Sequence, residues 1–386
     1  MSTAYPTLNF GLGEEIDMLR DSVWSFAQSE LAPRAESIDK ENAFPNEMWK
    51  KLGDLGLLGI TVSEEYGGSG MGYLAHCVAM EEISRASASV GLSYGAHSNL
   101  CVNQIYKNAN AAQKEKYLPK LCSGEHIGAL AMSEPGAGSD VVSMKLRAEK
   151  KGDKYILNGN KMWITNGTIA DVALVWAKDD DGVVRGFLIE KGMEGFSAPE
   201  QHGKLSLRAS ITSELVLENV RVPDSARLPN VEGLKGPLSC LTQARYGITW
   251  GVIGAAVDCY ETALDYSLQR KQFSKPIAGY QMTQAKLVEM LTHITEAQLL
   301  VLRLGRMKDE GTMDFSQVSM AKRANVAMAR DIARTSREIL GANGIIDDYS
   351  PIRHMANMET VYTYEGTHEM HTLILGEKIT GHSAFD

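Results

Sequence analysis

One carboxylate near the C-terminus lies in surroundings that suit it to act as a base. Glu365 is followed by Gly366 and lies between Tyr364 and Thr367. Loss of water beside aromatic and apolar surface raises the pKa of a carboxylate, and a base that removes a proton from carbon next to a carbonyl needs such tuning. Glu365 could instead serve only as a negative charge at the start of a helix. We expect the catalytic role, and the rest of the chain must then position this side chain.

The overall composition excludes several classes of function. The chain has 386 residues, which is too long for one ordinary core and predicts two or three domains. A net charge of −9 without a dense run of lysine and arginine argues against nucleic acid or an anionic membrane as the partner. No apolar run is long enough to span a bilayer. Five cysteines without C-x-x-C spacing indicate buried thiols in a reducing compartment and no metal site.

The two ends of the sequence bear on its location. The segment from Met1 to Glu15 has no basic region followed by an apolar stretch, and it is too acidic for a transit peptide. The chain ends in Ser383-Ala384-Phe385-Asp386, without a Ser-Lys-Leu peroxisomal address. We therefore expect a cytoplasmic protein in a bacterium, or a mitochondrial matrix protein if a transit peptide has been removed.

Hydrophobic periodicity predicts helices at both ends of the chain. Residues 14 to about 128 read as helical, and one of these helices is expected over 46–55. After about residue 235 the apolar residues again recur at helical spacing. One of these long helices is expected over 317–340, with the run that begins at Gly341 as its C-cap.

Residues from about 129 to 230 have the pattern of short strands. We interpret 155–164 as two strands around an Asn-Gly turn. The apolar stretches 172–177 and 183–189 flank an acidic turn and predict a second hairpin. Several short strands with regular turns favour a small barrel or sandwich.

Four motifs follow one another along the chain at a distinctive spacing. They are LAMSEPGAGSD at 130–140, WITNG at 163–167, RKQFSKPI at 270–277, and GANG at 341–344 followed by YEGT at 364–367. Each motif is weak alone. Together, in this order, they resemble the acyl-CoA dehydrogenase family over essentially the whole chain.

The resemblance implies an α+β multidomain fold in which a small β-barrel domain separates two helical domains. The boundaries expected are 1–128 for the N-terminal α-helical domain, 129–232 for the β domain and 233–386 for a C-terminal four-helix-bundle domain. The resemblance also implies FAD, a homotetramer, an acyl-CoA substrate, and an electron-transferring flavoprotein as electron acceptor. In the family the base removes the α-proton while the β-hydrogen leaves as hydride to flavin N5. The backbone N–H of the base and a flavin ribityl hydroxyl stabilise the thioester oxygen.

The resemblance also implies the cofactor contacts, residue by residue. The matching positions are Met132, Ser133, Trp163 and Thr165 beside the flavin, Arg270, Gln272 and Phe273 on the FAD of a neighbouring subunit, and Glu338, Gly341, Thr367 and Glu369 at the remaining parts of the cofactor site. An arginine suits the pyrophosphate because its guanidinium binds two phosphate oxygens at once. Taken singly, Trp163 could be core packing and Arg270 could form an ion pair on a solvated helix.

Members of the family place the base at one of two positions. Most use the glutamate of the late Tyr-Glu-Gly motif, which is Glu365 here. Others use a glutamate just before an arginine in the first long C-terminal helix, and that position is Ala244, followed by Arg245. Because alanine cannot accept a proton, we expect Glu365 to be the base and Arg245 to be a structural or CoA-side residue.

The two halves of the chain resemble different branches of the family. The first half looks like isovaleryl-CoA dehydrogenase and the second like glutaryl-CoA dehydrogenase, a mixture that also allows a recombined, reconstructed or designed chain. Glutaryl enzymes hold the distal carboxylate with an arginine and a serine, and those positions are Gly91 and Gly95 here. A carboxylate without an ion partner is costly in a dry pocket, so we expect a short-chain or branched short-chain acyl-CoA such as isovaleryl-, isobutyryl- or butyryl-CoA. The other expected substrate contacts are Ser139, near the CoA moiety, and Tyr364 and Gly366.

Three alternatives remain open on the sequence alone. A glutaryl-CoA dehydrogenase would also decarboxylate its product to crotonyl-CoA. A short-chain acyl-CoA oxidase would share the fold and the base but let oxygen reach the reduced flavin. A flavoprotein-like binding subunit without catalysis is the third, although the joint presence of Ser133, Trp163, Thr165, Arg270 and Glu365 argues against it.

Overall fold

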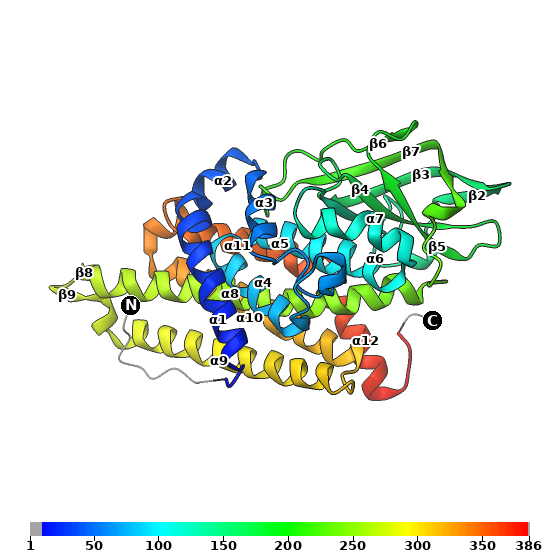
Figure 1. Ribbon diagram of the computed structural model, residues 1–386. Coiled ribbons are helices and arrows are strands. Elements are labelled where there is room, and N and C mark those ends of the chain that lie inside the picture. Colours follow the sequence, from blue (N-terminus) through cyan, green and yellow to red (C-terminus); the bar gives the residue numbers. More distant parts are fainter. Residues whose placement is uncertain (1–9, 385–386) are drawn as a thin grey trace.

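The computed structural model describes residues 10–384, so the parts of the targeting expectations that fall on 1–9 and 385–386 lie outside the described residues. Its N-terminal part is helical, as expected (Figure 1). The helices are α1 (Glu14–Phe26), α2 (Ala35–Glu41), α3 (Glu47–Asp54), α4 (Gly72–Ala86), α5 (Ala88–Gly95), α6 (Asn103–Asn108) and α7 (Ala111–Cys122), with a π-helical segment, Ala96–Val102, after α5. The helix expected over 46–55 is confirmed as α3.

The central part forms one strongly curled sheet with seven strands (Figure 1). Its strands are β1 (Gly128–Ala131), β2 (Arg147–Lys151), β3 (Lys154–Thr165), β4 (Val172–Lys178), β5 (Val184–Glu190), β6 (Phe196–Ser197) and β7 (Thr212–Pro223). Neighbours along the sheet run β1-β4-β2-β3-β7-β6, and β5 pairs with β4. This sheet carries the two segments that were assigned to the flavin.

The expected hairpin over 155–164 is wrong, because β3 is one continuous strand of 12 residues. It pairs antiparallel with the equally long β7, with a register shift between Leu157 and Gly159. Gly159 has a φ of 137°, which only glycine adopts readily, and the strand bends there without reversing. A long partner strand therefore overrode the Asn-Gly turn signal.

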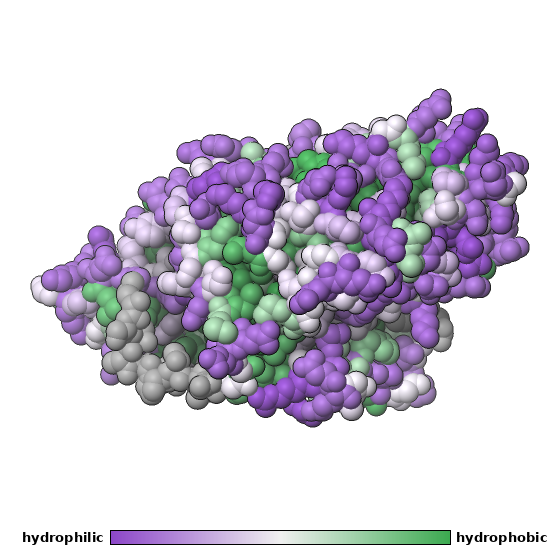
Figure 2. All heavy atoms as spheres, viewed as in Figure 1, coloured by the Kyte–Doolittle hydropathy of each residue, from purple (hydrophilic) through white to green (hydrophobic). Residues whose placement is uncertain are grey.

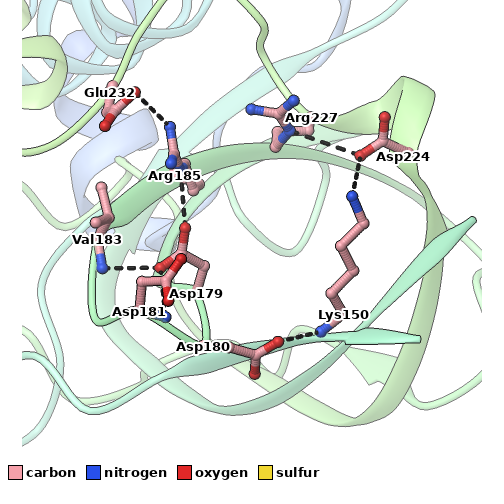
Figure 3. Close-up of polar contacts among 9 residues, drawn as sticks. All are labelled: Lys150, Asp179, Asp180, Asp181, Val183, Arg185, Asp224, Arg227 and Glu232. Carbon is pink, nitrogen blue, oxygen red and sulfur yellow. Dashed lines mark hydrogen bonds and ion pairs between the residues drawn. The ribbon is translucent and has the colours of Figure 1, made fainter. Parts of the chain in front are cut away.

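The second expected hairpin is confirmed, as β4 and β5 pair antiparallel. The Asp179 side chain fixes its turn by accepting hydrogen bonds from the backbone N–H groups of Asp181 and Val183 (Figure 3). Arg185 bonds to the same carboxylate at 2.9 Å and to Glu232 at 3.0 Å. These contacts connect the hairpin to the segment that leads into the C-terminal helices.

The C-terminal part consists of long helices packed side by side (Figure 1). They are α8 (Lys235–Gln269), α9 (Gln281–Asp309), α10 (Phe315–Ile339), α11 (Ser350–Thr363) and α12 (His368–Thr380), with a short hairpin, β8 (Lys271–Gln272) and β9 (Lys275–Pro276), after α8. The helix expected over 317–340 is confirmed as α10. It begins at Asp314, whose side chain forms a capping box with Gln317.

The helices α8 and α4, which carry residues of the site, pack closely against each other. A β-carbon at Gly254 would lie 2.0 Å from the carbonyl oxygen of Glu81, and one at Gly247 would lie 3.0 Å from Nδ2 of Asn99. Glycine at 254 therefore lets the backbones of α8 and α4 approach each other, and glycine at 247 makes room for the side chain of Asn99 in the segment Ala96–Val102. Because these elements pack closely, little space remains between α4, α5 and α8.

Burial and surface character agree with a globular protein. All five cysteines are free and buried, as expected. Figure 2 shows a mostly hydrophilic face on which hydrophobic side chains gather near the middle, beside α1. None of the helices within residues 10–384 is both long and apolar enough to cross a bilayer. The same residues contain no group of histidine, cysteine and acidic side chains that could hold a metal ion.

Candidate active site

Glu365 lies in the short turn that joins α11 to α12. Its backbone is left-handed, with a φ of 51°, and that of Gly366 follows with a φ of 89°. Left-handed backbone is uncommon for a residue with a side chain, so other contacts must hold the turn. Thr367 then caps α12, because its hydroxyl accepts a hydrogen bond from the backbone N–H of Met370.

Two buried cations hold three consecutive carbonyl oxygens of this turn. Lys322, from α10, donates from Nζ to the oxygens of Tyr364 at 2.5 Å and of Gly366 at 2.6 Å. Arg245, from α8, donates from Nε to the oxygen of Glu365 at 2.8 Å. The backbone of Glu365 is thus fixed from two helices. This contact is structural, and the CoA-side role that was also expected for Arg245 stays a prediction.

The carboxyl group of Glu365 has the electrostatic properties of a base. Its buried Oε2 has no hydrogen-bond partner among the residues that the structure describes. Burial raises the pKa of Glu365 to about 7, and the charges of Arg245 and Lys322 limit that rise. Burial likewise lowers the pKa of the Lys322 ammonium group, which the charge of Glu365 counteracts. A carboxyl group that titrates near neutral pH and has no partner can accept a proton from a ligand.

Glu365 faces a small cavity between α4, α5 and α8. Apolar side chains of Met80, Leu92 and Ile248 make up much of its wall. Ala244 also lines it, so both base positions known in the family face the same space here. Of the two residues, Glu365 alone carries an ionisable group.

One corner of this cavity is polar. His76 and Asn99 both line it. Nδ1 of His76 lies 3.0 Å from the hydroxyl of Tyr94, whereas Nε2 is buried without a partner in the described part of the chain. Burial lowers the pKa of His76 to about 3, so the imidazole is neutral. This corner can hydrogen-bond a ligand or a water molecule but brings no charge.

The two glycines expected to make room for the acyl chain differ in their surroundings. Gly95 lines the cavity. Gly91 does not line it: a β-carbon there would lie 2.1 Å from Oγ of Ser84. The expectation that Gly91 opens space for substrate is therefore wrong, because its missing side chain is what lets α5 pack against α4.

Two segments of the β domain form the expected flavin side. Trp163 lies within a register shift of β3, between Lys161 and Ile164, has a φ of 63° and leaves 64% of its surface exposed. The backbone N–H of Met162 donates to the carbonyl of Ser133 at 2.9 Å, which joins the two segments. Buried Lys161 strengthens this junction by donating from Nζ to the carbonyl oxygen of Met132 and to Glu134, both at 2.9 Å.

These segments fit a flavin. The exposed indole of Trp163 offers a large apolar face, which is unusual for a soluble surface unless something covers it. The hydroxyl groups of Ser133 and Thr165 are partly exposed near it and can donate or accept hydrogen bonds. At Gly136 and Gly138 an added β-carbon would meet nothing within 4 Å, so the backbone there is open to a ligand.

The residues expected to reach a neighbouring subunit's FAD lie away from Trp163. Arg270, Gln272 and Phe273 are exposed at the β8–β9 hairpin, which projects beyond the end of α8 (Figure 1). Phe273 is 92% exposed, and it and Ser274 have left-handed φ values of 51° and 72° at the tip. Within one chain, this group does not meet the flavin-side segments.

The remaining expected residues are spread over the surface. Glu338 forms an ion pair with Lys286 at 3.0 Å. Gly341 ends α10 with a φ of 62° and has no neighbour within 4 Å of a built β-carbon. Glu369 is exposed in the first turn of α12, and Ser139 is exposed beyond β1.

Several residues at the site were missed from the sequence, and one of them carried a signal. Lys322 lies on the buried face of α10 with Val318, Ala321 and Asn325. A lysine at an apolar helical position is rare unless it is paired, so its spacing could have singled it out. Met80 and His76 carried no such signal, since α4 is buried almost all round.

Comparison with known proteins covers nearly the whole chain. Three domain models of acyl-CoA dehydrogenases match it: the N-terminal domain at residues 13–125, the middle domain at 129–220 and the C-terminal domain at 232–380. The mitochondrial isovaleryl-CoA dehydrogenase of Arabidopsis thaliana is 46% identical over 367 residues, which cover 93% of this chain and 90% of that protein.

Solved structures show the same similarity but a different substrate name. A crystal structure of glutaryl-CoA dehydrogenase from Mycobacterium smegmatis is 45% identical, with a TM-score of 0.95 and coverage of 97% of both chains. A glutaryl-CoA dehydrogenase structure from that organism in complex with FADH2 is 43% identical, with the same TM-score and coverage. Since similar proteins are named for two acyl groups, the choice of substrate depends on the site.

Proposed function

This chain belongs to the acyl-CoA dehydrogenase family, and we propose that it oxidises a short-chain or branched short-chain acyl-CoA to the 2-enoyl-CoA with Glu365 as the base. The proposal rests on one observation. Glu365 faces a cavity lined by apolar side chains, and its buried Oε2 has no hydrogen-bond partner within residues 10–384. Isovaleryl-, isobutyryl- and butyryl-CoA are the substrates that we propose. We propose residue roles for the reaction that this family carries out with FAD.

Glu365 removes the α-proton of the acyl thioester. Its pKa, raised by burial, brings the carboxyl group close to the range in which a base is effective at neutral pH. The backbone N–H of Glu365 donates a hydrogen bond to the thioester oxygen, which stabilises the negative charge that develops there. Arg245 and Lys322 hold the backbone and thereby the direction of that N–H.

Bound FAD would supply the hydride acceptor for the β-hydrogen. We propose that Met132, Ser133, Trp163 and Thr165 hold its ring. Arg270, Gln272 and Phe273 of a second subunit would reach its pyrophosphate and adenosine. Glu338, Gly341, Thr367 and Glu369 would contact the remaining parts of the cofactor. The exposure of the β8–β9 hairpin supports this role in a homotetramer.

The charge of the site favours an apolar acyl chain over glutaryl. The base-side cavity has Glu365 as its only acidic side chain and no lysine or arginine in its lining. A neighbouring cavity, which shares Met80, Leu92 and Ile248, is also lined without a cation. A distal carboxylate buried there would lack an ion partner and would lose several kcal/mol of hydration, roughly. Ser139, Tyr364 and Gly366 remain proposed substrate contacts, with Arg245 acting through Glu365.

Glutaryl-CoA is the second candidate, because two solved structures named for it are 45% and 43% identical to this chain. Such an enzyme would decarboxylate its product to crotonyl-CoA. The choice between substrates can be made with one panel. The purified protein, loaded with FAD, is mixed without oxygen with isovaleryl-, isobutyryl-, butyryl- and glutaryl-CoA, and the loss of flavin absorbance is followed.

We expect rapid bleaching with the three monocarboxylic substrates and little with glutaryl-CoA. Preferential bleaching by glutaryl-CoA, with release of carbon dioxide, would overturn the proposed substrate class. An oxygen electrode during turnover separates a dehydrogenase from a short-chain acyl-CoA oxidase, since fast peroxide formation would overturn the former.

We base proposals for the electron acceptor and for the location of the protein on the same family membership. We propose an electron-transferring flavoprotein as the acceptor. The Arabidopsis relative is described as mitochondrial, and we propose the mitochondrial matrix, or the cytoplasm of a bacterium, for this protein. Reduction of a purified electron-transferring flavoprotein by the substrate-reduced enzyme would test the first of these proposals.

A further inference from the structure

Two small cavities lie next to each other, the first between α4, α5 and α8, and the second between the same helices and α11. The first contains Glu365, and the second contains Tyr364, the preceding residue. Met80, Leu92 and Ile248 line both cavities. These three side chains therefore form the wall between the space beside the base and the space beyond it.

Met80 is the part of this wall that can move. A β-carbon at Gly95 would lie 3.2 Å from Cε of Met80, and one at Gly251 would also lie 3.2 Å from that atom. The end of the Met80 side chain thus occupies room that two glycines, on α5 and α8, leave open. Methionine is unbranched and flexible and fills irregular gaps, whereas Ile248 is β-branched and stiff.

The second cavity suits an apolar chain end. Ala88, Val252, Met358 and Val361 line it, and its hydroxyl groups come from Ser84 and Tyr364. Burial raises the pKa of the Tyr364 hydroxyl, which therefore stays neutral. An extended hydrocarbon chain that passed the wall would meet mainly methyl and methylene groups, which favours its burial.

We propose that Met80 sets the acyl-chain length of this enzyme, as a side-chain partition that confines the acyl group to the space beside Glu365. The inference rests on the proposed function. With Met80 in place the site takes acyl groups of about four or five carbons. Without its thioether the two cavities join, and straight saturated chains of about six to eight carbons enter the second one. Each methylene that gains a place in an apolar pocket changes kcat/KM by roughly 10- to 200-fold.

The test compares the FAD-loaded parent protein with Met80→Ala on butyryl-, hexanoyl- and octanoyl-CoA. We expect the ratio of kcat/KM for octanoyl-CoA to that for butyryl-CoA to rise by at least about tenfold in Met80→Ala. Met80→Leu keeps most of the side-chain volume, so its kcat/KM ratio for the two substrates should stay close to the parental ratio. Met290→Ala is the matched control, because Met290 is equally buried in α9 but lines neither cavity.

The outcomes separate the two proposals. A parent that is bleached by butyryl- or isovaleryl-CoA, with an unchanged chain-length ratio in Met80→Ala, would overturn the partition and leave the proposed function standing. The partition would also be overturned if Met290→Ala raised the chain-length ratio as much as Met80→Ala does, since general loosening of the core would then explain the change. A parent that already prefers octanoyl-CoA would overturn the partition as well. A parent bleached by glutaryl-CoA alone would overturn both.

Discussion

Nε of Arg245 lies 2.8 Å from the carbonyl oxygen of Glu365, so the arginine beside the second family base position holds the backbone of the residue that we propose as the base. Lys322 holds the carbonyl oxygens on either side of it. Within residues 10–384, Oε2 of the carboxyl group has no hydrogen-bond partner. Glu365 is therefore fixed through its main chain while its side chain stays available to a ligand, an arrangement that suits the proton transfer we propose.

Replacing Lys322 with methionine should reduce activity most at low and neutral pH. Activity needs deprotonated Glu365, so it rises as the pH increases through the pKa of that group, which burial has raised to about 7. Because the charge of Lys322 limits this rise, its loss should move the acid limb of the kcat/KM profile upward by on the order of one pH unit. Lys322→Arg, which keeps the charge, should restore much of the limb. An unmoved limb with only a lower melting temperature would assign Lys322 a purely structural role.

The shared cavity predicts that the base can be moved. Glu365→Gly should lose activity by about 10²- to 10⁴-fold, and glycine suits the left-handed backbone there. Adding Ala244→Glu places a carboxylate in the same cavity and should recover activity by at least about tenfold over the single variant. The control is Ala244→Gln in the Glu365→Gly background, which has similar shape and no base. Equal rates for the Glu and Gln variants would contradict the shared geometry.

The buried pair of Lys161 and Glu134 should be essential for flavin retention. Lys161→Met leaves the Glu134 carboxylate buried without its cation, a change that costs about 3–5 kcal/mol in comparable cases. Because Lys161 also holds the carbonyl of Met132, the variant should be purified with less FAD. Urea unfolding and the ratio of flavin to protein absorbance measure both effects. The control is Lys145→Met, because Lys145 is exposed and contacts Glu134 only through its backbone N–H; it should stay within about 0.5 kcal/mol of the parent.

The contact between α8 and α4 should not tolerate a side chain at Gly254. A β-carbon there would lie 2.0 Å from the backbone oxygen of Glu81, so Gly254→Ala must push the helices apart. We expect a loss of about 1–3 kcal/mol in the free energy of unfolding. Gly376→Ala, in α12 with nothing within 4 Å, should instead be neutral or stabilising by up to about 1 kcal/mol. Equal effects at the two sites would disprove the close packing.

The sequence allowed the layered order of helices, sheet and helices to be predicted, because hydrophobic periods and turn residues are local signals. It misled at residues 155–164, where pairing with the distant β7 keeps the strand continuous through Gly159. Strand pairing depends on contacts far apart in the chain, which no local pattern encodes.

The candidate site was predictable where motifs marked it and not elsewhere. Glu365 was found because its neighbours form a motif, and its backbone contacts with Lys322 and Arg245 required the structure. Gly91 shows the opposite case: its type suggested an open pocket, but Ser84 fills the space that its side chain would occupy. Whether a position on α4, α5 or α8 faces the cavity depends on how these helices pack, which the residue type alone does not show.

The central claim is that Glu365 is the proton acceptor, and Glu365→Gln tests it most directly. The glutamine keeps nearly the same shape but cannot accept the α-proton at neutral pH. The variant should be purified yellow and still bind acyl-CoA, while bleaching of its flavin by isovaleryl- or butyryl-CoA without oxygen slows by about 10²-fold or more. Bleaching at close to the parental rate would contradict the account, because another group would then be removing the proton.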